Sequence, residues 1–329
     1  MKAKQKTIGV LTSGGDAPGM NAAIRAVVRT ALCKNMRVLG VRHGYSGLLS
    51  RDVQEMDLRS VSDILHRGGT VLGTARCLAF REDTGVEEGR RACEELGMDG
   101  LVVIGGDGSF RGARELSLKG VPCIGIPGTI DNDIASSSYT VGFDTAINTV
   151  MEMVDKLRDT SQSHDRCSIV KVMGRNCGDL ALYAGIACGA IAVLIPELPF
   201  SLEHIVEKIK RTLPMGKKHF IVLVAEGVPD KNGAPSLEEI AQEIERRTGV
   251  ESRTTILGHV QRGGMPTARE RVLASQMGYY AVELLEKGIG NKVIVVQKDE
   301  IVDMDILRAL DMKKSFQARL YQIADDISI

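Results

Sequence analysis

The chain has 329 residues, enough for two domains of ordinary size and for a substantial core without disulfide support. Its 42 Lys and Arg residues balance 42 Asp and Glu residues, so the net charge of zero gives no bulk attraction to nucleic acid or an acidic membrane, and we expect neither as a partner. No apolar run approaches the ~20 residues of a membrane span, and Ile8–Leu11 is too short for a secretory signal. Seven cysteines without a C-x-x-C pair predict reduced thiols and a cytoplasmic protein.

Glycine accounts for 36 residues, about 11 % of the chain against a typical ~7 %, and many of these glycines follow short apolar runs. Such runs, ending in glycine turns and followed by helical patterns, are typical of buried parallel strands. Between residues 143 and 158, apolar side chains recur every three or four residues, which predicts a helix. The predicted strands are 7–12, 37–42, 100–104, 122–126, 167–173, 191–195, 219–225, 253–258 and 292–296.

This alternation of strands and helices predicts an α/β fold with two doubly wound, Rossmann-like domains and mainly parallel central sheets. No linker rich in proline, serine or charge separates two halves, so we expect a short domain junction near Tyr139–Gly142. In such folds, ligands bind to the loops at the carboxyl ends of the strands.

Three glycine-rich loops follow predicted strands. The first, Gly14–Asn21, opens a helix whose backbone N–H groups can bind an anion, although a tight turn explains the same glycine pair. The second, Gly105–Ser109, sets Asp107 between glycines, which leaves room for a phosphate and offers a hard oxygen ligand for Mg²⁺. The third, Pro127–Asp133, holds two carboxylates, one of which can accept a hydroxyl proton while the other orients water or metal. Three such loops at strand ends favour phosphate chemistry over simple turns.

Several arginines lie beside glycines or at strand borders rather than on helix faces, where a guanidinium can bind phosphate through two hydrogen bonds. A solvated surface position is the alternative for each of them except within Gly258–Gly264, because the sequence GHVQRGG suits neither a core nor a helix. These arginines are Arg76, Arg166, Arg175, Arg253 and Arg262.

The motifs LTSGGDAPGMNAAIR, VVIGGDGS, PGTIDND, VMGR and GHVQRGG follow one another along essentially the whole chain. Together they resemble the ATP-dependent phosphofructokinases of the bacterial type. The resemblance implies in-line transfer of the γ-phosphate of ATP to the 1-hydroxyl of fructose 6-phosphate, with ATP as co-substrate and Mg²⁺ as cofactor. It also implies a homotetramer with shared active sites. The larger, ATP-binding domain would be 1–142 with 261–311, and the smaller, fructose 6-phosphate-binding domain 143–260 with 312–329.

The resemblance also assigns residues to roles. ATP and metal would be bound by Gly15, Arg76, Cys77, Gly106, Asp107, Gly108 and Ser109, with Asp107 as the metal ligand. Fructose 6-phosphate would contact Thr129, Asp131, Asp133, Arg166, Met173, Gly174, Arg175, Glu226, Arg253, His259 and Arg262. The catalytic group would be Asp131 as general base with Thr129, Arg76, Gly15 and Arg175. Arg166 and Arg253, which have no obvious acidic partner nearby in the sequence, would serve a neighbouring subunit.

Two alternatives remain at this stage. One is a pyrophosphate-dependent relative, in which the positions matching Gly108 and Gly128 carry aspartate and lysine; both are glycine here, which predicts ATP as donor. The other is a non-catalytic, nucleotide-sensing relative, since a fold does not fix a function. The presence of Asp107, Asp131 and Arg76 favours a catalyst.

The sequence departs from the family at its effector site. Positions that bind the effector phosphate are retained, but the activator's tyrosine, metal-binding glutamate and further lysine match Arg59, Ile191 and Met215. We expect weak or absent activation by ADP and binding of a compact anion, such as a phosphorylated carboxylate or inorganic phosphate. A pocket that binds nothing is the alternative. The predicted effector residues are Arg25, Arg29, Arg59, Arg158 and Lys217.

Overall fold

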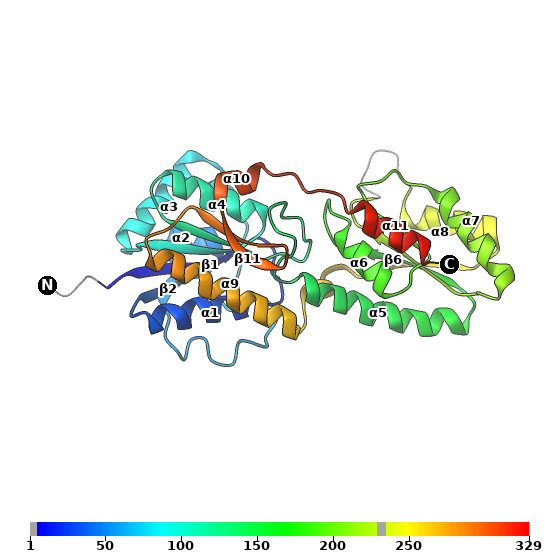
Figure 1. The fold of residues 1–329 in the computed structure, drawn as a ribbon, viewed down its shortest axis with the longest axis horizontal. Helices are drawn as coiled ribbons and strands as arrows, with labels where there is room; N and C mark the ends of the chain where they lie inside the picture. Colours follow the sequence, from blue (N-terminus) through cyan, green and yellow to red (C-terminus); the bar gives the residue numbers. More distant parts are fainter. Residues whose placement is uncertain (1–4, 229–234, 329) are drawn as a thin grey trace. The chain divides into compact units, whose positions relative to one another are not determined.

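The computed structural model describes residues 5–228 and 235–328 (Figure 1). The chain divides into two compact units. Unit 1 comprises the residues up to Ile130, Ile134–Thr145 and Arg262–Lys314. Unit 2 comprises Asp131–Asp133, Ala146–Gln261 and the residues from Ser315 onward. The chain therefore passes between the units within the third glycine-rich loop.

Unit 1 is built on a seven-stranded sheet with the order β11-β10-β5-β4-β1-β2-β3. The inner strands pair in parallel, and only the edge strands β3 and β11 are antiparallel to their neighbours. Strands β1, β4 and β5 are buried along their whole length, which explains why they read as continuous apolar runs. The strands are β1 (Thr7–Ser13), β2 (Arg37–Val41), β3 (Val53–Glu55), β4 (Gly100–Gly105), β5 (Cys123–Pro127), β10 (Lys292–Gln297) and β11 (Glu300–Asp305).

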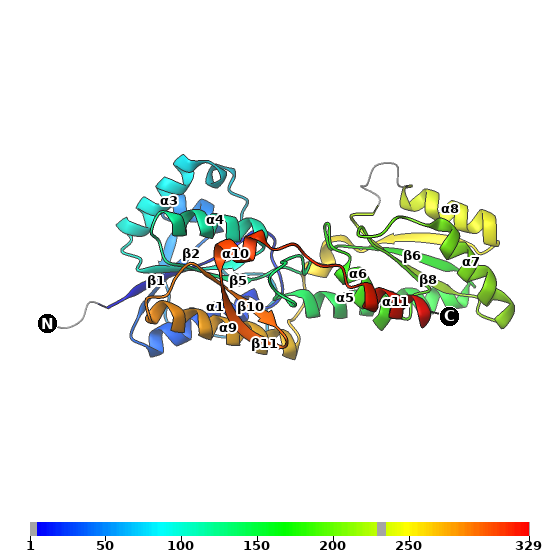
Figure 2. The same cartoon turned by 45° about the horizontal axis from the view of Figure 1, so that its top comes forward.

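Helices cover both faces of this sheet (Figures 1 and 2). Helices α1 and α9 pack together on one face, while α2, α3 and α4 lie on the other, with α10 against α4. Helices α1, α3 and α4 bury apolar side chains on one face and carry charged residues on the other, as a doubly wound fold requires. The helices are α1 (Met20–Cys33), α2 (Gly44–Ser50), α3 (Asp83–Glu95), α4 (Asp107–Leu118), α9 (Ala268–Glu286) and α10 (Ile306–Asp311), with a 3₁₀ turn, η1 (Leu78–Arg81).

Unit 2 contains a four-stranded sheet with the order β7-β8-β6-β9, and all of its pairings are parallel. In Figure 2, helices α5 and α8 lie on opposite faces of this sheet. The strands are β6 (Cys167–Val172), β7 (Ala192–Leu194), β8 (Phe220–Ala225) and β9 (Ser252–Ile256). The helices are α5 (Phe143–Ser163), whose first turn belongs to unit 1, α6 (Asp179–Ala187), α7 (Leu202–Thr212), α8 (Leu237–Thr248) and α11 (Ala318–Asp326), with 3₁₀ turns η2 (Leu213–Met215) and η3 (Gly258–Arg262).

The predicted α/β fold with two mainly parallel, doubly wound sheets is confirmed, and each predicted strand is present with bounds that differ by one or two residues. The predicted helix from residue 143 continues to Ser163. The edge strands β3 and β11 were not predicted. Both are only partly buried, and β11 follows β10 through Lys298 and Asp299, which have the positive φ values of a tight hairpin turn without its usual glycine.

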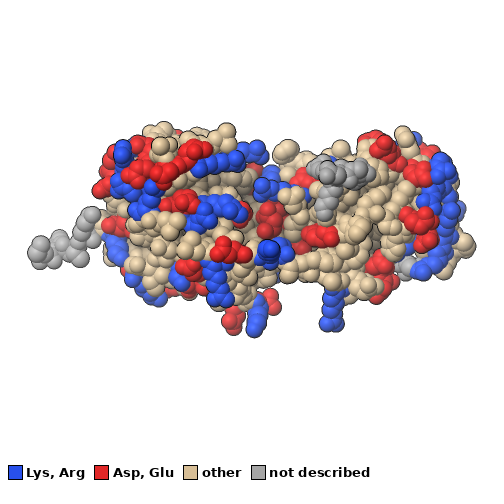
Figure 3. Space-filling view, turned by 90° about the horizontal axis from the view of Figure 1, so that it is seen from above, with Lys and Arg blue, Asp and Glu red and all other residues tan. Residues whose placement is uncertain are grey.

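Within the described part of the chain, no helix is long and apolar enough to cross a membrane. On the face shown in Figure 3, Lys and Arg side chains are interspersed with Asp and Glu on each unit, as the balanced composition implies.

Candidate active site

Strands β5, β4 and β1 are parallel neighbours, so the three glycine-rich loops of unit 1 emerge at one edge of its sheet. The loops are tied to one another by hydrogen bonds. The Ser109 hydroxyl donates to the carbonyl of Ser13 over 2.9 Å, and the Gly128 amide donates to the carbonyl of Gly105 over 2.9 Å. Backbone amides of all three loops are thereby held side by side, which is the arrangement expected of a phosphate-binding edge.

The first loop packs against a predicted substrate arginine. Arg262 Nη1 donates to the carbonyl of Asp16 over 3.1 Å. A Cβ atom added at Gly15 would lie 2.4 Å from the same nitrogen, so a side chain at this position would displace the guanidinium. The structure therefore brings together Gly15 and Arg262, which lie almost 250 residues apart in the sequence.

The segment that carries Arg76 and Cys77 runs beside the first loop. The Thr74 hydroxyl donates to the carbonyl of Gly14 over 2.7 Å, and Thr12 Oγ1 donates to the carbonyl of Gly73 over 2.8 Å. Arg76 itself is exposed, so its guanidinium is accessible to an anion at this edge.

The second loop becomes the first turn of α4. Gly106 is the residue before the helix, and Asp107 begins it. Asp107 is partly exposed and pairs with Arg111, one turn later, over 2.8 Å. Nothing lies within 4 Å of a Cβ atom added at Gly108, so this position opens to solvent. By contrast, Ser109 is buried, and its hydroxyl is already used to join two loops.

The third loop carries the candidate base. Thr129 is fixed in unit 1, since its amide donates to the carbonyl of Val141 over 2.9 Å and its carbonyl accepts from the Thr140 hydroxyl over 2.7 Å. Asp131, two residues later, is only 7 % exposed. Asp133 lies 3.7 Å from Arg175 Nη1 within unit 2. The loop is thus anchored on both sides of Asp131.

Strands β8, β6 and β9 are parallel neighbours, so the predicted substrate residues at their carboxyl ends also gather at one edge. The Arg175 amide donates to Glu226 Oε1 over 2.5 Å. The Met173 amide donates to Gln261 Oε1 over 3.1 Å, next to the exposed His259. This edge brings together residues of two predicted motifs, VMGR and GHVQRGG, with Glu226.

Two positioning residues at this edge were missed by the sequence analysis. Gln261 is fully buried and also donates to the carbonyl of Gly258 over 2.8 Å, which fixes the 3₁₀ turn that carries His259. Asp179 accepts from the Asn132 side-chain amide over 2.9 Å and so supports the third loop. Gln261 stands inside the GHVQRGG motif and was detectable there. Asp179 carries no such signal, because its partner is 47 residues away.

Gly174 cannot be replaced without strain. Its φ of +129° lies in a region that side chains rarely adopt, and an added Cβ would lie 2.5 Å from the carbonyl oxygen of Cys177. The glycine therefore sets the sharp turn that exposes Arg175, which itself has a positive φ of 56°.

Arg166 and Arg253 lie apart from this edge. Arg166 precedes β6 and Arg253 is the second residue of β9, whereas the predicted substrate edge lies at the other end of these strands. The six residues of β6 separate Arg166 from Met173 by ~20 Å, and Arg253 pairs with Ser168, five residues or about 17 Å before Met173, so both guanidinium groups are too far away to reach the same site. The expectation that neither has an acidic partner was wrong, because Glu251 pairs with both, through its Oε2 atom over 2.8 Å to Arg166 Nε and through its Oε1 atom to Arg253.

The predicted effector residues fall in both units. On α1 in unit 1, burial and then the nearby Arg29 lower the pKa of Arg25, while Arg59 is exposed. In unit 2, burial, followed by Arg158 and Lys208, lowers the pKa of Lys217. In each unit, positively charged side chains therefore lie near one another, and a bound anion would reduce the repulsion between them.

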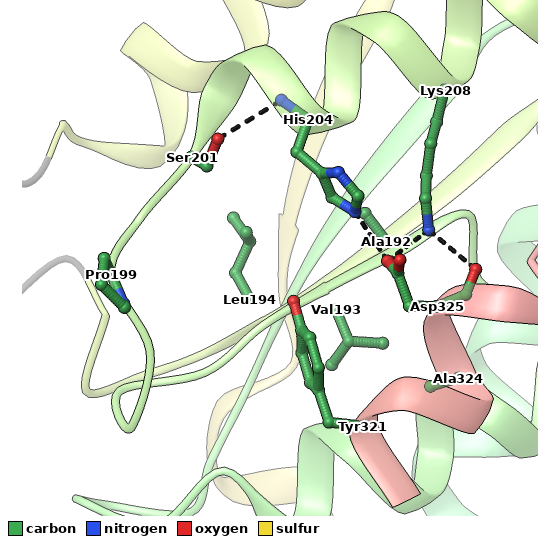
Figure 4. A pocket seen from close by; sticks show the side chains of 10 residues that line it. All are labelled: Ala192, Val193, Leu194, Pro199, Ser201, His204, Lys208, Tyr321, Ala324 and Asp325. Atoms are coloured by element: carbon green, nitrogen blue, oxygen red, sulfur yellow. Dashed lines mark hydrogen bonds and ion pairs between the residues drawn. The ribbon is translucent and has the colours of Figure 1, made fainter. Parts of the chain in front are cut away.

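These unit 2 cations donate to backbone carbonyls. Arg158 donates to the carbonyl of Cys188, and Lys217 Nζ donates to the carbonyl of Ser328 over 3.4 Å. A cavity between β7, α7 and α11 is lined in part by His204, Lys208 and Asp325 (Figure 4). The side chains of His204 and Lys208 each contact the Asp325 carboxylate. None of the predicted site residues lines this cavity.

Among residues 5–228 and 235–328, no cluster of three or more His, Cys, Asp or Glu side chains could hold a metal by itself. Magnesium usually keeps several waters and binds through one or two carboxylates together with substrate phosphates. The accessible Asp107 carboxylate, at the start of α4, fits a magnesium ion carried by a nucleotide.

Together, the sheets and loops define a doubly wound α/β protein with glycine-rich loops at its strand ends. A sequence model of the family described as Phosphofructokinase matches residues 7–285, and the chain belongs to this family. The chain is 54% identical over 323 residues to a protein of Clostridium botulinum named ATP-dependent 6-phosphofructokinase, covering 98% of this chain and 99% of that one. A protein of Clostridium perfringens named ATP-dependent 6-phosphofructokinase 1 matches with the same identity and coverage.

A solved structure supports the same relationship. The phosphofructokinase from Saccharomyces cerevisiae aligns with a TM-score of 0.88 and 35% identity over 99% of this chain. The alignment covers 48% of the yeast chain, so this chain spans about half of that relative's length.

Proposed function

We propose that this chain transfers the γ-phosphate of ATP to the 1-hydroxyl of D-fructose 6-phosphate, giving fructose 1,6-bisphosphate and ADP. The observation that carries the proposal is the third loop. It carries the buried Asp131 between Thr129, which is hydrogen-bonded within unit 1, and Asp133, which pairs with Arg175 within unit 2. The curated relatives named above support ATP as the donor.

In this mechanism Asp131 accepts the proton of the sugar 1-hydroxyl as that oxygen attacks the γ-phosphate. Arg76 and the amides around Gly15 stabilise charge on the transferred group and on the leaving ADP. A magnesium ion bound with ATP at Asp107 would supply further charge neutralisation. The residues contribute mainly by position and electrostatics, because in-line transfer needs no covalent enzyme intermediate.

We assign ATP to unit 1 and fructose 6-phosphate to unit 2. Within unit 2, Met173, Arg175, Glu226 and His259 gather at one strand edge and offer both backbone and charged groups to a sugar phosphate. Arg262, which packs on Gly15, completes the predicted set from unit 1.

We further propose a homo-oligomer, a homotetramer by family resemblance, in which Arg166 and Arg253 bind the sugar phosphate of a neighbouring subunit. Their position at the opposite end of the strands supports this role, since they cannot reach the substrate edge of their own chain. The proposed location is the cytoplasm, where glycolytic substrates and reduced thiols coexist.

A coupled assay tests the reaction directly. Purified protein is supplied with fructose 6-phosphate and either ATP, pyrophosphate or no donor, and fructose 1,6-bisphosphate is measured. Turnover with ATP alone is expected. Equal or faster turnover with pyrophosphate would show that the enzyme belongs to the pyrophosphate-dependent class. No turnover with either donor would favour a nucleotide sensor.

A further inference from the structure

A buried polar network joins the first turns of α5 and α9 in unit 1. The Thr267 hydroxyl caps α9 by accepting from the Glu270 amide over 3.2 Å, and it donates to Asp144 Oδ2 over 2.5 Å. The Thr145 hydroxyl accepts from the Thr267 amide over 3.2 Å and donates to Glu270 Oε2 over 3.2 Å. Tyr139 donates its hydroxyl proton to the other oxygen of Asp144 over 2.9 Å.

Glu270 is the buried end of this network. Its relative exposure is 0 %, and its Oε1 atom has no hydrogen-bond partner. Its side chain also packs on the first glycine-rich loop: a Cβ atom added at Gly19 would lie 2.9 Å from Glu270 Cγ and 2.8 Å from Val141 Cγ1. Val141 in turn accepts the hydrogen bond from the Thr129 amide.

Three segments of the proposed active site therefore meet at this side chain. The first loop ends at Gly19, the third loop is held by Val141, and α9 follows the GHVQRGG turn that carries Arg262. We propose that Glu270 is a positioning residue that keeps these segments in register for phosphoryl transfer, and that its change of ionisation alters this register. The inference rests on the proposed function.

The surroundings of Glu270 determine the direction in which its pKa is shifted. Burial raises the pKa of Glu270 to about 7, and the Asp144 carboxylate adds to this rise, whereas hydrogen bonds from the Gly142 and Thr145 amides and the Thr145 hydroxyl oppose it. On the same helix, the neighbouring Arg269 lies over the Tyr139 ring at 4.1 Å, and the first turn of α1 brings no titratable side chain. The protonated carboxyl is thus the form that suits the buried site.

A carboxyl with a pKa raised by folding binds more protons in the folded than in the unfolded state. Stability therefore falls as the pH rises from about 4.3, the ordinary glutamate value, through about 7. Glu270→Gln keeps the shape of the protonated form but cannot ionise. We expect the wild-type protein to lose thermal stability relative to Glu270→Gln over this interval, while Glu283→Gln, a control on the same helix, follows the wild type.

The positioning role is tested by kinetics. The ratio of the KM for ATP of the wild type to that of Glu270→Gln should be near one at about pH 6 and at least about threefold at about pH 8. A constant ratio, or parallel melting curves at every pH, would overturn the proposal. The melting experiment needs no turnover, so a failure of the proposed reaction would be seen separately as a lack of activity in every protein.

Asp144→Asn provides a second measurement that does not depend on the folding of Glu270→Gln. Removing the Asp144 charge should move the midpoint of the stability change to lower pH, because one cause of the raised pKa is lost. An unchanged midpoint would also contradict the role given to Glu270.

Discussion

At the scale of single residues, the proposed chemistry depends on Asp131. The side chain is almost completely buried, and the loop on either side of it is fixed by Thr129 and Asp133. Removal of a general base costs on the order of 10²–10⁴ in rate. We expect Asp131→Asn to lower kcat by at least the smaller of these factors while the affinity for ATP changes little, as measured by steady-state kinetics and nucleotide titration. A variant with near-normal kcat would move the role to Asp133.

Gly108 provides a second prediction at this scale, concerning the choice of donor. The position is open, and it lies in the first turn of α4, where an added carboxylate is favoured by the helix N-terminus. Gly108→Asp should therefore fold normally but repel the phosphates of ATP, lowering kcat/KM for ATP by at least about tenfold. Gly108→Ala is the matched control and should remain close to wild type.

Gly128 differs from Gly108 because buried side chains surround it. An added Cβ there would lie 3.0 Å from Met20 Cε and 3.1 Å from Ile104 Cγ2, so a lysine at this position would disturb the core of unit 1. The two glycines that looked equivalent in the sequence thus differ in the structure. One borders open space, and the other is packed against buried side chains.

At the scale of strands and helices, the order of strands decides which residues can meet. Arg253 lies near the start of β9, and Met173 and Glu226 follow the ends of β6 and β8. Subunits with Arg253→Ala, mixed and exchanged with subunits carrying Asp131→Asn, should regenerate some sites in which both residues are intact. We expect activity above that of either parent. If verified mixed oligomers show no gain, the sharing of sites between subunits is contradicted.

Glu251 links the two arginines that are proposed to serve a neighbouring subunit. It pairs with both Arg166 and Arg253, so it sets their side chains on one surface of unit 2. Glu251 stands only two residues before Arg253, but its contact with Arg166 arises only from the pairing of β6 with β9.

At the scale of the whole molecule, the predicted effector site concerns regulation. The predicted effector residues Arg25 and Arg29 lie on α1 and Arg158 and Lys217 in unit 2, whereas Ile191, at the position that matches the metal-binding glutamate of the family, offers no magnesium ligand. We expect MgADP to have little effect on the fructose 6-phosphate saturation curve, whereas phosphoenolpyruvate or inorganic phosphate shifts it. The shift should disappear in Arg25→Ala. Strong relief of sigmoidal kinetics by MgADP, abolished in Arg25→Ala, would show that the ordinary activator site works despite Ile191.

The sequence by itself determined the alternation of strands and helices, the parallel core strands and the positions of the glycine-rich loops. These features are local, since buried parallel strands read as continuous apolar runs and glycine turns follow them directly. The candidate residues Asp107, Asp131 and Arg175 were also visible without the structure, because each stands in a recognisable motif.

Only the tertiary structure decided the contacts between distant segments. Arg262 packs on Gly15, Asn132 donates to Asp179, and Glu270 is buried against Gly19. None of these pairs has a periodic or local pattern, because each arises from the order of strands and the packing of helices on them. The burial that raises the pKa of Glu270 is likewise a property of the assembled unit, since no stretch of sequence excludes water from a side chain by itself.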